Sequence, residues 1–153
     1  MNLSVLVLHN VSPDMFFRYD PETSRLFHAH EFQVAADNIE KAADLVWNLT
    51  NVSDANELRS MRPDLGMYGA QVEEYRERRN RSLSVGDVLV FAELSDPPRP
   101  AGALWVDGLG FKQVSEIAYD GGGSNTTTQS NSYEAHILRA ANPASRLRVS
   151  KGN

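Results

Sequence analysis

The order of strand-like and helix-like segments constrains the fold of this chain more than any other feature. Short runs rich in β-branched and aromatic residues predict strands at residues 3–8, 15–19, 25–35, 87–94, 103–108 and 111–119. Apolar residues recur at three- and four-residue spacings in two segments between them, which predicts helices at residues 37–49 and 70–80. Residues 51–69 read as a loop-rich connection with at most one short helical turn.

Strands before and after a pair of helices predict an α+β domain with a small antiparallel or mixed sheet. Whether that sheet closes partly into a small barrel is left open. The 153 residues suit one domain, predicted at 1–120, followed by a Gly/Ser/Thr-rich linker or loop at 121–132. The basic segment at 133–153 has two alternatives: a short helix that Pro143 ends, or a strand at 146–150 that returns to the domain.

Charge is distributed unevenly within a net charge of −5. Residues 1–120 carry 11 Lys and Arg against 19 Asp and Glu, whereas residues 121–153 carry 4 against 1. An acidic body argues against a dedicated duplex-binding domain, which presents a broad positive face to phosphates. The chain has no cysteine, no signal-peptide pattern at its start and no apolar run long enough to span a bilayer. We therefore expect a cytoplasmic protein that does not enter the membrane.

The segment at residues 75–84, which spans the end of the second predicted helix, is the best candidate for a binding site. Four arginines at positions 76, 78, 79 and 81 can grip phosphates or an acidic partner surface. Interleaved glutamates favour the alternative of a solvated helix face, with Glu74 pairing with Arg78 and Glu77 with Arg81. The residues predicted to bind a partner are Tyr75, Arg79, Asn80, Arg81, Ser82 and Ser84.

A structural interpretation accounts for much of the sequence around the next strand. Gly86 and Asp87 are typical of a tight turn that leads into the apolar residues 88–91. Asp87 and Asp107 lie at the ends of predicted neighbouring strands, which permits a carboxylate pair, although both are also natural turn residues. No G-x-S-x-G elbow surrounds the serines, and no cofactor motif is present. Both tryptophans, Trp47 and Trp105, are expected in the core.

The stretch "YRERRNRSLSVGDV" with the downstream "WVDGLGFKQV" resembles the core of the YodL-like domains found in mobile genetic elements. It is also similar to small actinobacterial proteins that begin near "VLHN" and continue through "LTNV". The resemblance covers residues 3–117 in pieces and is tight only at 75–91, and the connection around residues 91–108 is longer than in typical members. It implies an accessory role in a mobile element and assigns no activity to any residue.

Two alternative functions rest on other residues. The pattern around residues 84–111 also resembles the small barrels of PUA and ASCH domains, which bind RNA or modified nucleotides. A nucleic-acid reader of this type is expected to use Arg79 and Arg81 with the basic residues Arg146, Arg148 and Lys151. A metal-dependent hydrolase instead requires His28 and His30 on one face of a strand, with a further ligand from His9, Asp20 or Glu22, and with Asp107 nearby.

The sequence therefore favours a non-enzymatic protein-interaction module, accessory or inhibitory, of a mobile genetic element, with no cofactor. The nucleic-acid reader is the first alternative and the hydrolase the second. The partner protein and the oligomeric state are not encoded in any motif of the chain.

Overall fold

The structure is a computed structural model that describes residues 1–11, 19–20, 24, 26–95 and 98–114 and three short strands at 117–119, 122–123 and 147–149. Its strands are β1 (Asn2–Asn10), β2 (Leu26–Ala35), β3 (Val88–Glu93), β4 (Arg99–Asp107), β5 (Gly110–Gln113), β6 (Ile117–Tyr119), β7 (Gly122–Gly123) and β8 (Leu147–Val149). Its helices are α1 (Ile39–Thr50), α2 (Ala55–Met61), the 3-10 helix η1 (Pro63–Tyr68) and α3 (Gly69–Glu77).

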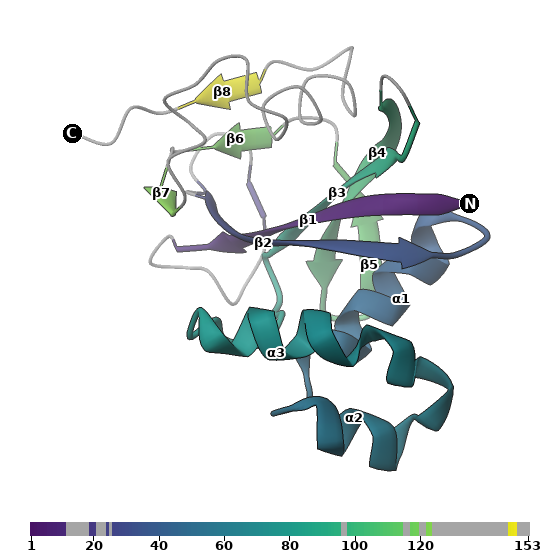
Figure 1. Ribbon diagram of the computed structural model, residues 1–153. Helices are drawn as coiled ribbons and strands as arrows, with labels where there is room; N and C mark the ends of the chain where they lie inside the picture. Colours follow the sequence, from purple (N-terminus) through teal and green to yellow (C-terminus); the bar gives the residue numbers. More distant parts are fainter. Residues whose placement is uncertain are drawn as a thin grey trace.

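Six strands form one sheet in the order β5-β4-β3-β1-β2-β7, and the first five are antiparallel neighbours. The short strand β7 pairs with β2 in parallel. Strands β6 and β8 pair in parallel as a separate two-stranded sheet (Figure 1). The prediction of an α+β fold with a largely antiparallel sheet is confirmed.

The sheet is open, so the barrel alternative is wrong for the part of the chain that the structure describes. Strand β5 forms one edge and β7 the other, and the two do not pair. Closure requires the two edge strands to hydrogen-bond along their length. With four residues in β5 and two in β7, the edges are too short to close the sheet in this way.

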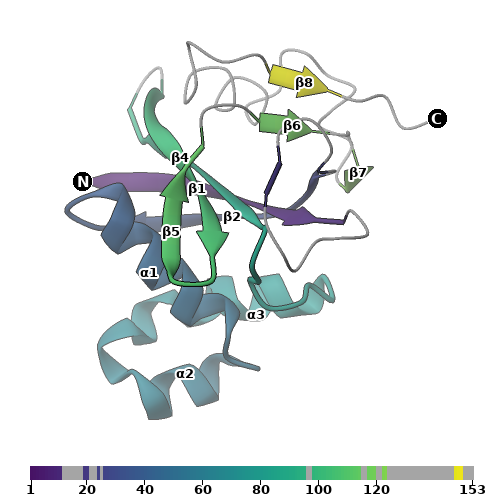
Figure 2. The same ribbon diagram turned by 180° about the vertical axis from the view of Figure 1, so that it is seen from behind.

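The helices lie together on one side of the large sheet (Figures 1 and 2). Apolar residues of α1 and α3 pack there against alternate residues of the central strand β1, Leu3, Val5 and Val7. The intervening residues of β1, including Leu6 and Leu8, belong to a second apolar cluster on the opposite face. Because both faces are covered, β1 is buried from Leu3 to Asn10, which explains its nearly continuous apolar sequence.

The connection at 51–69 contains more helix than its sequence predicts. The carboxylate of Asp54 accepts a hydrogen bond from the backbone N–H of Glu57 at 2.8 Å and caps α2. Pro63 then occupies the start of η1, where its missing N–H has no cost. Helix α1 begins in the same way, since the side chain of Asn38 accepts a hydrogen bond from the N–H of Lys41 at 2.8 Å.

A β-bulge interrupts the pairing of β1 with β2. Val7 lies opposite His30, but the next residue, Leu8, lies opposite His28, so Ala29 is the extra residue. Val7 faces the helices and Leu8 faces the opposite side of the sheet. The prediction that the two histidines share one face of a strand is therefore wrong.

Several predictions fall outside the described residues. These are the strand at 15–19 apart from Tyr19, most of the linker at 121–132, and the helix alternative for the segment that begins at 133. The domain boundaries also stay predictions. Within the described ranges, no helix is both long and apolar enough to cross a membrane.

The cap of α2 can be tested by substitution. We expect Asp54→Ala to lower the free energy of unfolding by about 1 kcal/mol, because the N–H of Glu57 loses its acceptor. Ser60→Ala, at an exposed position of the same helix, is the matched control. Equal stabilities of the two variants in urea unfolding would show that the cap contributes nothing.

Candidate functional site

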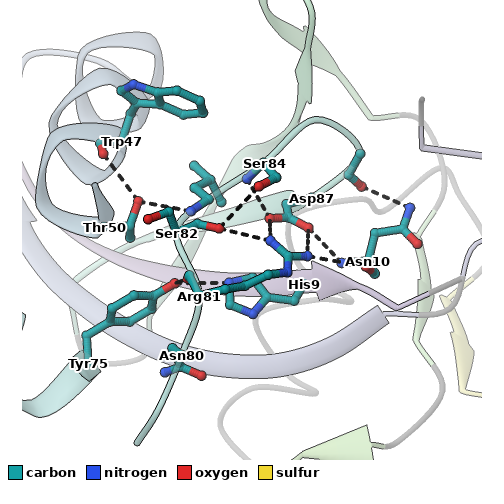
Figure 3. Close-up of polar contacts among 12 residues, drawn as sticks. His9, Asn10, Trp47, Thr50, Tyr75, Asn80, Arg81, Ser82, Ser84 and Asp87 are labelled. Carbon is teal, nitrogen blue, oxygen red and sulfur yellow. Dashed lines mark hydrogen bonds and ion pairs between the residues drawn. The ribbon is translucent and has the colours of Figure 1, made fainter. Parts of the chain in front are cut away.

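A buried ion pair anchors the segment that joins α3 to β3. The guanidinium of Arg81 faces the carboxylate of Asp87, with Nη1 to Oδ2 and Nη2 to Oδ1 both 2.7 Å (Figure 3). The Asp87 side chain is fully buried, and 32% of the Arg81 side chain is exposed. Two parallel charge-assisted hydrogen bonds are the strongest geometry for such a pair. The guanidinium of Arg81 therefore binds a buried group of the protein itself.

Backbone groups complete the surroundings of this pair. The Asp87 carboxylate accepts hydrogen bonds from the N–H of Asn10 and of Ser84, both at 2.8 Å. Arg81 also donates to the carbonyl oxygen of Ser82 at 2.9 Å and to that of Asn10 at 3.3 Å. Each carboxylate oxygen thus receives two donors, which offsets the cost of burying the charge. Since Asn10 ends β1 and Asp87 precedes β3, the pair fixes two neighbouring strands.

Tyr75 connects this pair to a buried histidine. Its hydroxyl donates a hydrogen bond to the carbonyl oxygen of Arg81 and lies 3.0 Å from Nε2 of His9. Because the hydroxyl proton points to the carbonyl, the contact with His9 requires a proton on Nε2. Burial lowers the pKa of His9 to about 4 despite the nearby Asp87, and burial and Asp87 together raise the pKa of Tyr75. Both groups are therefore neutral at pH 7.

Two other residues of the candidate segment also bind the protein's own backbone. Arg76 donates to the carbonyl oxygens of Val52, Asn80 and Thr50 at 2.8, 3.0 and 2.6 Å, and to Oγ of Ser82 at 3.1 Å. The side-chain amide of Asn80 donates to the carbonyl oxygen of the bulge residue, at 3.1 Å. These bonds hold the end of α3 against α1 and β2.

Arg79 differs from its neighbours in the segment. Its backbone has a φ of 59°, the left-handed conformation that glycine or asparagine usually adopts after a helix. The side chain is exposed and makes no hydrogen bond or ion pair with the residues that the structure describes. Of the residues predicted to bind a partner, Tyr75, Asn80, Arg81, Ser82 and Ser84 serve internal contacts, and Arg79 alone points its charge to solvent.

The two predicted helix ion pairs have different outcomes. Arg78 lies 3.3 Å from the carboxylate of Glu74, which confirms that pair at an exposed position. The pair between Glu77 and Arg81 is wrong, because α3 ends at Glu77 and Arg81 turns inward to Asp87. Local spacing predicts a pair only where the helix continues.

The two aspartates considered as a carboxylate pair bind different cations. Asp87 binds Arg81, whereas Asp107 lies 3.4 Å from Nζ of Lys112 across the β4–β5 hairpin. Asp107 thus has a structural partner on the neighbouring strand.

The histidines give no metal centre in the described part of the chain. His28 and His30 lie on opposite sides of β2, and no group of three or more His, Asp and Glu side chains converges among the described residues. His30 packs edge-on against Phe32 and Tyr75, with centroid distances of 4.7 and 5.6 Å. Neither of its ring nitrogens has a hydrogen-bond partner among the described residues, and burial lowers its pKa to about 4.

Other residues singled out from the sequence are placed as follows. Trp47 is 38% exposed on α1, so the prediction of a core tryptophan is wrong there, whereas Trp105 is half-buried against the second apolar cluster. Of the basic residues proposed for nucleic-acid binding, Arg148 lies in β8, and Arg146 and Lys151 lie outside the described residues.

Sequence reasoning missed Asn10 and Gln71. Asn10 binds both partners of the ion pair, and its side-chain amide donates to the carbonyl oxygen of Gly86 and to Oγ of Ser24, both at 3.1 Å. Gln71 bonds the backbone of Gln33, 38 residues away. No periodicity or motif signals such contacts, because each depends on segments brought together only by the sheet.

Comparisons with known proteins add no assignment. No protein-family model matches the chain, and neither a curated protein nor a solved structure is significantly similar to it.

The ion pair predicts a large difference between two arginines of the segment. We expect Arg81→Ala to lower the free energy of unfolding by about 2 to 3 kcal/mol, because it leaves the Asp87 carboxylate buried without its cation. This loss lies at or below the lower end of the range of about 3 to 5 kcal/mol for fully buried pairs, since part of Arg81 reaches solvent. Arg78→Ala, which breaks an exposed pair, is expected to cost below about 0.5 kcal/mol. Equal losses in urea unfolding would contradict the structural role of Arg81.

The buried histidines predict a loss of stability in mild acid. His9 and His30 have pKa values of about 4 in the folded protein, against about 6.5 in an unfolded chain. Between these values the unfolded state binds more protons, so stability falls as the pH drops from about 6.5 towards about 4. His30→Leu is expected to remove about half of the loss seen in urea unfolding between about pH 7 and about pH 5. An unchanged pH profile in this variant would exclude His30 as a cause.

Proposed function

We propose that this protein is a protein-interaction module that binds an anionic group on its partner through Arg79. The observation that carries the proposal is the conformation of this residue. A left-handed backbone costs an ordinary L-residue roughly 1 to 2 kcal/mol, and a glycine or asparagine would remove most of that cost. A strained, exposed cation that has no partner in the described part of the chain supports a role outside the fold.

The surroundings of Arg79 support an interface. Helix α3 and strand β2 run in opposite directions, and Asn80, next to Arg79, bonds to Ala29 of β2 (Figure 1). Two positions before Ala29 in β2, Phe27 is 36% exposed, and Val11, just beyond the paired end of β1, is 48% exposed. An arginine near exposed apolar side chains is a composition typical of protein interfaces.

The wider role follows from the resemblance of the segment at 75–91. We propose that the protein is a cytoplasmic accessory or inhibitory component of an actinobacterial mobile genetic element. This part of the proposal rests on the YodL-like pattern and on the acidic body of the chain.

The alternatives receive less support. A nucleic-acid reader needs several free cations to neutralise phosphates, but Arg81 is bound to Asp87, Arg76 to backbone carbonyls and Arg78 to Glu74. One free arginine in this segment supports a single contact. A metal-dependent hydrolase that uses His28 and His30 together conflicts with their positions on opposite faces of β2.

Arg79→Gly separates binding from stability. We expect this variant to raise the free energy of unfolding by about 0.5 to 1 kcal/mol, because glycine relieves the positive φ. We also expect it to lose most of the protein that the wild type captures from an actinobacterial lysate, with or without nuclease. Arg78→Ala, which removes a positive charge from the preceding residue, is the control for capture.

The outcomes decide between the functions. Equal capture by Arg79→Gly and the wild type would contradict the proposed role of Arg79. Capture that disappears on nuclease treatment would favour the nucleic-acid reader instead.

A further inference from the structure

Strand β2 has an outer edge that carries little strand pairing. Its inner edge pairs with β1 along its whole length, from Leu26 to Ala35. On the outer edge, the only described neighbour is β7, which pairs with Phe27 and His28. No strand among the described residues continues this pairing along residues 29–35.

Side chains of the helical layer take the place of a neighbouring strand. The amide of Gln71 accepts a hydrogen bond from the N–H of Gln33 at 2.8 Å and donates one to its carbonyl oxygen at 2.9 Å. The hydroxyl of Tyr68 accepts from the N–H of Ala35 at 3.2 Å. Gln71 thus offers β2 the same donor and acceptor that a residue of a paired strand would offer.

Side chains of the helical layer are what protect this edge. Natural edges carry lysine or proline, twist away at bulges or are covered by a helix or loop, and β2 contains neither lysine nor proline but is covered by Gln71 and Tyr68. Its bulge at Ala29 precedes a regular stretch that ends at Ala35. The two hydrogen bonds between Gln71 and the backbone of Gln33 are exposed, so solvent reaches the outer edge there. The hydrogen bonds of Gln71 are therefore accessible and replaceable.

We propose that the outer edge of β2 from His30 to Ala35 receives an extended segment of the partner protein, which displaces the side-chain hydrogen bonds of Gln71 and Tyr68 and adds a strand to the sheet. This inference rests on the proposed function and names its binding mode. Strand addition to an exposed edge is an established way in which proteins bind peptides. The pairing of β7 at the start of the same edge shows that the backbone there accepts a parallel neighbour.

The position of Arg79 specifies the partner further. The contacts of Tyr68, Gln71 and Asn80 with β2 run in the order Ala35, Gln33 and Ala29, so Arg79 lies at the bulge end of this edge. When main-chain hydrogen bonds of the bound segment replace the side-chain hydrogen bonds of Gln71 and Tyr68, the number of hydrogen bonds is unchanged. The affinity must therefore come from side chains of the segment that bind outside the strand pairing. The segment is therefore expected to carry an acidic residue near the bulge end, within reach of Arg79.

Proline provides a sharp test of strand addition. The N–H of Gln33 points outward to Gln71, so Gln33→Pro removes the outward donor while the inner pairing with β1 is kept. Gln33→Ala is the control, because it retains the N–H. Gln71→Ala is expected to strengthen the binding of a segment, since it removes the side chain that occupies the edge.

The probes are peptides selected on the full-length wild type from a library of short random sequences displayed on phage. Their binding is titrated by fluorescence polarisation.

We expect the selected peptides to lose at least about tenfold in affinity for Gln33→Pro, to bind Gln33→Ala unchanged and to bind Gln71→Ala several-fold more tightly. If Gln33→Pro does not fold, the gain in Gln71→Ala and the slower hydrogen exchange of the Gln33 and Ala35 amides on binding serve as the test. Failure to select any peptide, or equal binding to Gln33→Pro and the wild type, would overturn strand addition.

The two proposals fail in different ways. Peptides that need Arg79 but tolerate Gln33→Pro would leave the proposed function intact and overturn strand addition. Peptides that need the Gln33 N–H but tolerate Arg79→Gly would support strand addition and contradict the role of Arg79. A wild-type dimer that Gln33→Pro dissociates would assign the edge to a second copy of this chain and overturn the partner segment.

Discussion

The ion pair between Arg81 and Asp87 holds the centre of this fold together. Its carboxylate binds the end of β1 through Asn10 and the turn before β3 through Ser84, and its guanidinium binds the segment after α3. Strands β1 and β3 are adjacent in the sheet, so the pair fixes the point where the helical layer returns to the strands. Because the carboxylate is fully buried, neither charge can be removed alone without a large penalty.

This constraint separates structural from functional residues in the most distinctive part of the sequence. Arg81, Ser84 and Asp87 build the ion pair and its turn, and Tyr75 supports the carbonyl of Arg81. Arg79 takes no part in these contacts, and it lies in a left-handed backbone conformation that is unfavourable for an arginine. It lies near the bulge end of the β2 edge, where a side-chain amide stands in for a strand. A binding surface built on these two features would use backbone pairing to set the register of the bound segment and the arginine as the anchor that supplies affinity.

Local patterns in the sequence predict most of the main elements, because strands and amphipathic helices follow from the spacing of neighbouring residues. The single strand predicted at 111–119 is wrong, because β5 and β6 are separate strands in different sheets. Local patterns cannot predict the bulge at Ala29, which depends on the register of two strands and places His28 and His30 on opposite faces. The ion-pair partner of Arg81 cannot be predicted from local sequence either. The four-residue spacing predicts Glu77, whereas in the structure Arg81 turns inward and binds the buried Asp87. The cap residue Asp54 is a helix-start signal in the sequence, but the loop-like composition of residues 51–69 predicts little helix there.

A double-mutant cycle on Arg81 and Asp87 tests most directly whether this segment is structural. The free energies of unfolding of Arg81→Ala, Asp87→Ala and the double variant are measured by urea unfolding and compared with the wild type. A coupling energy of about 2 kcal/mol or more is expected for a bidentate pair with a buried carboxylate. A coupling below about 0.5 kcal/mol would contradict the structural role and would return Arg81 to the residues available for a partner.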